Sequence, residues 1–199
     1  MFRELLSAVA AILTFAIFVP YIRSIRSGRT RPHVFSWMIW GLGTVIVFFA
    51  QLAGHGGIGA WPIGLSGLIT LYVAWLAHHH RGDASVTGMD WVFLLLALAA
   101  LPCWFFTADP LWAVVVLTTS DLLGFGPTFR SAWHKPHEER TGFYALATLR
   151  NLLVILALEH HSLTTVLFPA AVGMGCLVLV LLIARRRSAV AKTTGSVRR

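Results

Sequence analysis

Seven apolar runs of about 20 residues dominate this sequence and limit the folds that it can adopt. A helix needs about 20 apolar residues to cross the ~30 Å hydrocarbon core of a bilayer, and its backbone groups must be paired within the segment. With 57% hydrophobic and 12% charged residues, the chain has too little polar surface for a water-soluble globule of 199 residues. The sequence therefore predicts an all-α polytopic membrane protein with seven transmembrane helices. The runs lie at about 5–24, 34–53, 61–79, 90–107, 111–130, 142–158 and 163–184.

An internal repeat at a constant offset of 107 positions is the second constraint. Thr14–Ser24 reads TFAIFVPYIRS and Asp121–Ser131 reads DLLGFGPTFRS, so both contain the pattern Phe-x-Pro-x-x-Arg-Ser. The same offset carries Pro62 onto Pro169 without a gap. We therefore predict two copies of one structural unit.

Each copy holds three of the apolar runs, and the run at 90–107 has no counterpart. Three spans reverse the direction of the chain, so one more helix is needed for the second copy to enter the membrane in the direction of the first. We expect a 3+1+3 arrangement with two parallel triple-helix repeats, related by an axis along the membrane normal. The opening run belongs to the first copy, which argues against a cleaved signal peptide. The predicted parts are a first repeat at 1–84, a linker helix at 85–109, a second repeat at 110–188 and a basic tail at 189–199.

The Lys and Arg residues predict the orientation. The formal net charge is +8, and fourteen of the sixteen Lys and Arg residues share one face if the spans alternate in direction; the exceptions are Arg3 and Arg150. The positive-inside rule makes that face cytoplasmic, with the N-terminus outside and the C-terminus inside. We expect an integral protein of a bacterial inner membrane, in which the basic segments contact anionic lipid of the bilayer and not nucleic acid.

Two charged residues within predicted helices are the main candidates for a functional site. Asp121 and Arg150 each lie nine residues from the cytoplasmic end of their span, about 13 Å into the membrane. Charges at such a depth usually pair or face a cavity, so we expect an Asp121–Arg150 ion pair, with Asn151 and Thr14 at the same level. The pair has two interpretations: a clamp between helices, or a site that handles solute and protons. The desolvation penalty of buried ion pairs favours the second.

Two tryptophans and two prolines are further candidates. Trp37, Trp40 and Thr44 share a helix face at i, i+3 and i+7. We expect Trp40 and Trp37 to contact solute, although an aromatic belt at the membrane interface also explains Trp37. Pro20 and Pro127 lie near the cytoplasmic ends of their helices, where a proline kinks the helix. They are candidate hinges, with plain helix packing as the alternative.

The sequence gives little reason to expect an enzyme or a metalloprotein. It contains no nucleophile beside a base, no Gly-rich phosphate loop and no metal-ligand spacing. His78, His79 and His80 are consecutive, so on a helix their side chains point in different directions. We therefore expect no metal and no cofactor. Cys103 and Cys176 lie in apolar runs and imply no disulfide.

A basic turn follows the proline in each copy, at Arg23 to Arg31 after Pro20 and at Arg130 to Arg140 after Pro127. With the 3+1+3 plan, this resembles the PQ-loop and SWEET superfamily of membrane transporters, a plan that nicotinamide riboside carriers share. The glutamine that names the PQ loop is replaced by Tyr21 and Thr128. The resemblance implies alternating access, with prolines that help two triplets rock about a solute site between them.

On this chain, the resemblance places Thr14, Trp40, Asp121, Arg150 and Asn151 around the solute. Arg150 would hold a carboxylate or phosphate oxygen through its fork of donors, and protonation of Asp121 would release it. We expect a transporter of a small polar solute, such as a sugar, amino acid, carboxylate or nucleoside, as a monomer or homo-oligomer. The alternative is a receptor of the same fold that binds a small ligand without moving it.

Overall fold

The computed structural model describes residues 1–80, 84, 86–137 and 139–197, apart from the side chains of Pro127 and of residues 190–197. Over these residues the chain is helical and contains no β-strand. Arg81, Arg198 and Arg199, which contribute to the expected orientation, lie outside the described residues. The elements are α1 (Phe2–Arg26), α2 (Val34–Ala53), the 3₁₀ helix η1 (Gly57–Ala60), α3 (Trp61–His79), α4 (Gly88–Thr107), α5 (Pro110–Gly124), α6 (Gly126–His134), α7 (Thr141–Ala157) and α8 (Leu163–Val197).

Six helical segments of the described chain are long and apolar enough to cross a membrane. One of them joins η1 to α3 and another joins α5 to α6. The helix α7 is apolar but shorter, at 17 residues. The fold is therefore compatible with an integral membrane protein.

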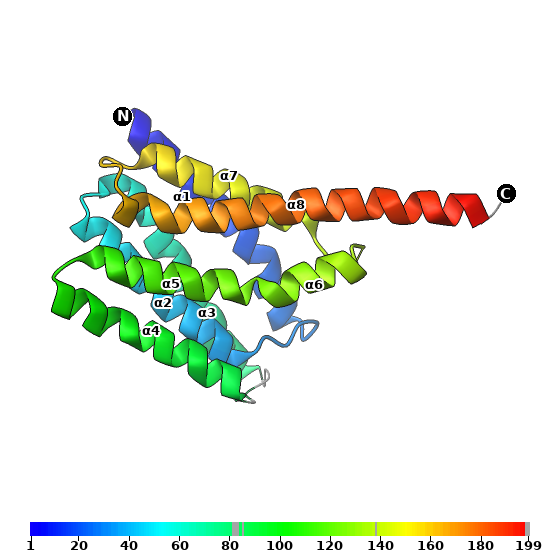
Figure 1. Ribbon diagram of the computed structural model, residues 1–199, viewed down its shortest axis with the longest axis horizontal. Helices are drawn as coiled ribbons and strands as arrows, with labels where there is room; N and C mark the ends of the chain where they lie inside the picture. The colour runs from blue at the N-terminus through cyan, green and yellow to red at the C-terminus, as the bar shows by residue number, and fades with distance from the viewer. Residues whose placement is uncertain (81–83, 85, 138, 198–199) are drawn as a thin grey trace.

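Six helices form a ring in which each packs against the next. Their order around the ring is α1, α3, α2, α5, α8, α7 and back to α1. The helix α4 lies outside this ring, against α2 and α5, as Figure 1 shows. Buried residues on α2, α5, α7 and α8, among them Val47, Val114, Val154 and Phe168, form the main core. The interior of the ring is the place where side chains from distant parts of the sequence meet.

The helices alternate in direction, so the bundle has two distinct ends. At one end Arg26 at the end of α1 donates to the Tyr72 hydroxyl on α3 at 2.6 Å, and Arg186 on α8 donates to the carbonyl of Trp133 on α6 at 3.0 Å. We call this the basic end. At the far end, Ser7 on α1 donates to the carbonyl of Ile58 in η1 at 2.8 Å.

Two clusters near the basic end occupy corresponding positions. The first lies on α1, α2 and α3, and the second lies on α6, α7, α8 and the junction between α5 and α6. Six of the seven residues of the second cluster lie 107 positions after a residue of the first. They are Phe125, Phe129, Ala132, Tyr144, Leu179 and Ile183, which follow Phe18, Ile22, Ile25, Trp37, Tyr72 and Leu76.

The structure differs from the predicted helix limits in two places. The run expected as one helix at 111–130 is divided into α5 and α6, with Phe125 between two glycines at the junction. Pro127 occupies the first turn of α6, where a missing backbone N–H costs no helical hydrogen bond. The helix α8 continues beyond residue 184 because no glycine or proline follows until Gly195.

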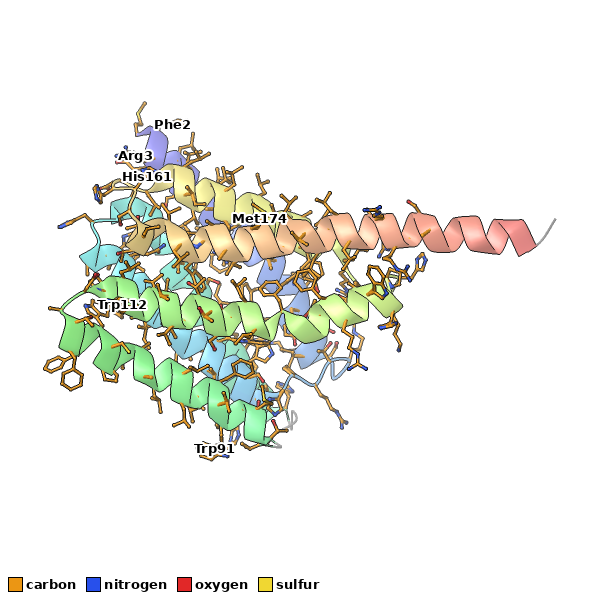
Figure 2. All side chains as sticks on the ribbon, in the orientation of Figure 1. Phe2, Arg3, Trp91, Trp112, His161 and Met174 are labelled. Carbon is orange, nitrogen blue, oxygen red and sulfur yellow. The ribbon has the colours of Figure 1, made fainter. Side chains whose placement is uncertain are left out.

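Large apolar side chains cover much of the outer surface. Trp91 on α4 is 55% exposed and points away from the bundle in Figure 2, and Met174 on α8 is 60% exposed. Phe105 and Phe106, near the end of α4, are more exposed still. A surface of this kind is suited to lipid and not to water.

Candidate functional site

Arg150 lies in the interior, and it is the only Lys or Arg that is buried among the described residues, with 8% exposure. Its Nη2 donates to the Ser66 hydroxyl on α3 at 3.3 Å, and its Nη1 donates to the Asn151 side-chain oxygen at 3.3 Å. Both hydrogen bonds are long, and Nε has no partner. The guanidinium therefore has unused donor capacity at a site without bulk water.

No carboxylate neutralises Arg150 in the part of the chain that the structure describes. The ion pairs found there join the N-terminal amine to Glu4 at 3.1 Å and His33 to Asp90 at 3.9 Å. The predicted Asp121–Arg150 pair is thus absent within the 4.0 Å limit of an ion pair. The packing order explains this, because α8 lies between the helices that carry the two residues.

Asp121 faces α2 from α5. It shares a helix face with Leu117 and Gly124, four residues before and three after. A Cβ atom at Gly124 would lie 3.6 Å from the Trp40 indole nitrogen, and one at Gly43 would lie 3.2 Å from the Leu117 side chain. The carboxylate is partly buried and has no hydrogen-bond partner among the described residues.

Thr14 is fully buried on α1 and lies at the level of the α7 guanidinium. One turn before it, Ala10 shares a core cluster with Val154, and one turn after it, Ile17 shares another with Ala147. Since α1 and α7 run antiparallel, these contacts set the register between the two helices. The Thr14 hydroxyl donates to the Ala10 carbonyl at 2.9 Å. Thr14 therefore lines the interior, but its hydroxyl proton is already donated within α1.

Asn151 is also buried, at 1% exposure. Its side-chain nitrogen donates to the Ala147 carbonyl at 2.9 Å, and its oxygen accepts from Arg150. A Cβ atom at Gly173 would lie 3.0 Å from the Asn151 Cβ atom, so α7 and α8 approach closely there. Asn151 therefore orients Arg150 and packs against α8.

The two tryptophans belong to one aromatic group at the basic end. Trp37 stacks on Tyr21 with ring centroids 4.9 Å apart and meets Phe18 edge-on at 6.3 Å. Trp40 meets Trp37 edge-on at 5.7 Å and is 39% exposed. Trp37 thus binds α1 to α2, whereas Trp40 extends toward α5.

A pocket of about 610 Å³ opens at the basic end, between the last turns of α1 and the first turns of α7. The lining residues farthest from the basic end are Ala16 on α1 and Leu146 on α7, which lie within about one turn of Thr14 and Arg150. Five aromatic side chains line it: Phe18, Tyr21, Trp37, Phe143 and Tyr144.

Polar groups surround the mouth of the basic-end pocket. The Glu139 carboxylate accepts from the Ser131 hydroxyl at 2.6 Å and from the Tyr144 hydroxyl at 2.8 Å. Ser24 and Thr30 share a hydrogen bond of 2.6 Å across the turn after α1. Glu139, Ser24 and Thr30 all line the pocket.

At the opposite end, which we call the closed end, η1 contacts the segment that joins α7 to α8, beside a pocket of about 740 Å³ that is lined by the first residues of α1, by η1 and by Glu159. The Glu159 carboxylate accepts from the Ile58 backbone N–H at 3.1 Å, and the Glu159 N–H donates to the Gly56 carbonyl at 3.1 Å. A Cβ atom at Gly59 would lie only 2.5 Å from the Leu158 nitrogen. This close approach of two backbones excludes larger side chains.

Gln51 adds a contact to the closed end. It is fully buried on α2, and its side-chain nitrogen donates to the Thr165 carbonyl on α8 at 2.7 Å. Its side-chain oxygen has no partner. The closed end is thus held by backbone contacts and by one incompletely satisfied amide.

The candidate hinges lie in different settings. Pro20 lines the basic-end pocket and is exposed, and α1 continues through it as one helix. The backbone at Pro127 begins α6, whereas the side chain lies outside the described residues. The break between α5 and α6 lies at Phe125, two residues before Pro127.

Sequence reasoning missed several residues of this interior. Ser66 is the main one. It accepts a hydrogen bond from Arg150 in the structure, whereas the sequence was interpreted there only as an apolar run. Its signal was available, because a hydroxyl lies among small residues in the run at 61–79. Thr118 on α5 is buried and its hydroxyl has no hydrogen-bond partner among the described residues, and Glu159 follows Leu158, the residue that caps the end of α7. The described residues contain no group of three or more His, Cys, Asp or Glu side chains that could hold a metal.

Comparison with family models, with curated proteins and with solved structures gave no match to this chain.

Proposed function

We propose that the protein is a membrane transporter that moves a small polar solute by alternating access between two triple-helix units. The observation that carries the proposal is Arg150, a buried and incompletely bonded guanidinium that reaches from α7 to Ser66 on α3. Intramembrane ionisable residues are costly and usually belong to substrate or ion pathways.

The packing order supports two units related by internal symmetry. α3 packs between α1 and α2, and α8 packs between α5 and α7. Contact of α1 with α7 has a counterpart in contact of α5 with α2. The matching clusters at the basic end support the same offset. We propose that residues 1–84 and 110–188 are parallel repeats, with α4 as the linker and seven spans in total.

The two ends of the bundle support alternating access. The basic end has a pocket whose lining on α7 reaches to one turn from Arg150. At the opposite end, η1 contacts Glu159 and Gln51 contacts Thr165, beside a second pocket of about 740 Å³ whose lining on α1 ends at Glu4, about 15 Å along the helix from Thr14. The basic-end pocket therefore comes closer to the Arg150 level, as alternating access requires of the open side. By the positive-inside rule, the basic end is cytoplasmic, the N-terminus is outside and the C-terminus is inside, and we propose a bacterial inner membrane.

The PQ-loop and SWEET resemblance agrees with this proposal through the arrangement of helices. Transport in that superfamily uses a solute site between the triplets, which here is the level of Thr14, Arg150 and Asn151. Trp40 and Asp121 would complete it from the α2–α5 side. Asp121 has no bonded partner, so it is free to exchange a proton with solute or water, and we propose it as the coupling site.

The test is counterflow in proteoliposomes loaded with sugars, amino acids, carboxylates or nucleosides. Exchange of one class, lost in Arg150→Leu and retained in the surface variant Arg26→Leu, supports a transporter with its site at Arg150. An Asp121→Asn variant with unchanged exchange across pH removes the coupling role. Absence of exchange for every solute, with ligand-dependent stabilisation retained, favours a receptor of the same fold.

A further inference from the structure

We infer that the solute is a monoanion that carries a flat ring, bound with its carboxylate on Arg150 and its ring against the aromatic wall of the basic-end pocket. This inference rests on the proposed function, because it assigns a ligand to the same site. It is carried by the charge of the interior and by the composition of the pocket.

The charge of the interior favours an anion. Arg150 has no carboxylate within 4.0 Å among the described residues, and its Nε is unpaired. Its two hydrogen bonds go to neutral oxygens, and both are 3.3 Å long. A carboxylate would supply the missing charge and accept two parallel N–H bonds from the guanidinium fork. A neutral sugar or a cation would leave the buried charge uncompensated.

One negative charge fits this site better than two. Arg150 is the only buried Lys or Arg in the described part of the chain. Asp121 on α5 is half-buried and adds a second carboxyl group on the side of the bundle next to α2. A phosphate ester close to −2 would face a single cation and this carboxyl group, and would pay the larger desolvation penalty. We therefore choose a carboxylate over a phosphate.

The pocket wall favours a ring. Tyr21 and Trp37 stack with an interplanar angle of 27°, and together they present a flat aromatic surface to the pocket. Phe143 and Tyr144 line the opposite side from α7. These aromatic side chains bind a flat ring more favourably than an aliphatic chain. Offset stacking and edge contacts with a ring add to the free energy gained from buried area.

The path between the wall and the guanidinium is short. Tyr144 and Arg150 are six residues apart on α7, about 9 Å along the helix axis. Helical side chains lean toward the N-terminus of their helix, which for α7 is the pocket end. The cluster of Ile17, Ala147 and Cys176 lies between the pocket and the guanidinium level. A ligand whose ring stays at the aromatic wall must therefore extend its carboxylate through a thin apolar layer, in which one member is only alanine, to meet the Arg150 side chain.

The experiment is equilibrium binding to the purified full-length protein in detergent, followed by tryptophan fluorescence and calorimetry. The probes are benzoate, acetate, benzamide and benzyltrimethylammonium, which separate charge from ring. We expect benzoate to bind about tenfold or more tightly than acetate, and benzamide and the cation to bind at least about tenfold more weakly than benzoate. Equal affinity for benzoate and acetate would refute the ring, and tight binding of benzamide or the cation would refute the anion.

Three variants assign the effect to residues. Arg150→Leu should abolish benzoate and acetate binding alike, whereas Arg150→Lys should retain part of both because it keeps the charge without the fork. Trp37→Leu should reduce benzoate affinity to the level of acetate and leave acetate unchanged. Trp112→Leu, at an exposed position on α5, is the matched control and should change neither. Benzoate binding that survives Arg150→Leu in a monodisperse protein overturns the assignment.

The outcome separates this inference from the proposed function. Benzoate binding without counterflow of any solute keeps the ligand class and removes the transport proposal. Counterflow of a sugar or another neutral solute, with no benzoate binding, keeps transport and removes the ligand class.

Discussion

Arg150 on α7 donates a 3.3 Å hydrogen bond to Ser66 on α3, and these two helices belong to different halves of the chain. The contact is the polar link between the halves at the level where each side also presents buried threonine or asparagine side chains. Because the bond is long and the Nε donor is unused, the guanidinium is held loosely at a place where a charge is costly. The stability of the bundle and the binding of a ligand should therefore depend on the same group.

Removal of the Ser66 hydroxyl should weaken the empty protein. In Ser66→Ala, the Arg150 Nη2 atom loses its partner in a buried setting, so we expect a loss of about 1 kcal/mol in the free energy of unfolding. The measurement is thermal unfolding in detergent. Thr70→Val is the control, because the Thr70 hydroxyl donates to the Ser66 carbonyl within α3 and does not contact Arg150. An equal loss of stability in both variants would show that the hydrogen bond between Arg150 and Ser66 contributes no more than a hydrogen bond within α3.

Replacement of the charge itself should have the opposite effect on stability. Arg150→Met keeps most of the apolar volume and removes a buried charge without a counter-ion, so we expect unfolding to be unchanged or harder, by up to about 4 kcal/mol. Transport should be lost in the same variant. Thermal unfolding and counterflow on one preparation test both parts. A marked loss of stability would indicate that Arg150 is a structural clamp and not a ligand group.

The helical, membrane-compatible character of the fold was accessible from the sequence because the solvent sets the apolar length of a spanning helix. Lipid requires long, internally bonded helices, so the runs at 5–24 and 34–53 correspond closely to α1 and α2. The break at Phe125 was not accessible, since Gly124 and Gly126 are tolerated within many helices. Whether two glycines interrupt a helix depends on the packing of its neighbours.

The candidate site was only partly accessible. The depth of a residue in the membrane can be counted along its helix from the sequence. This count put Arg150, Asn151 and Thr14 at one level, and the structure buries all three. The rotation of each helix and the order of packing cannot be counted, and for that reason Asp121 was paired with Arg150 although α8 separates their helices. The Ser66 hydroxyl could be seen among small residues in the sequence, but its contact with Arg150 could not, because nothing in its own segment identifies the helix that it faces.

An added methyl group at Gly59 should open the closed end. In Gly59→Ala the new Cβ atom would lie 2.5 Å from the Leu158 nitrogen, and backbone atoms on both sides cannot move aside without separating η1 from the α7–α8 junction. We expect a loss of about 1–3 kcal/mol in stability. We also expect faster reaction of a cysteine placed at Gln51 with a membrane-impermeant maleimide, in a background in which Cys103 and Cys176 are replaced by alanine.

The control for Gly59→Ala is Gly88→Ala at the start of α4, where an added Cβ atom meets nothing within 4 Å. It should leave both stability and labelling unchanged. If Gly59→Ala also leaves the labelling rate unchanged while stability falls, the contact is structural and does not control access from this end.

Stiffening of the α5–α6 junction should slow transport without weakening binding. An added Cβ atom at Gly126 meets nothing within 4 Å, so Gly126→Ala is free of steric cost and favours helix by about 1 kcal/mol through lower backbone entropy. If the junction bends during the alternation between inward-open and outward-open states, counterflow in Gly126→Ala should be several-fold slower with an unchanged dissociation constant. Gly88→Ala at the start of α4, which is equally unobstructed and lies outside the basic-end pocket, is the matched control. Equal rates in the two variants would mean that the junction is a fixed break, and the pivot would then have to be sought at Pro20, where α1 is continuous.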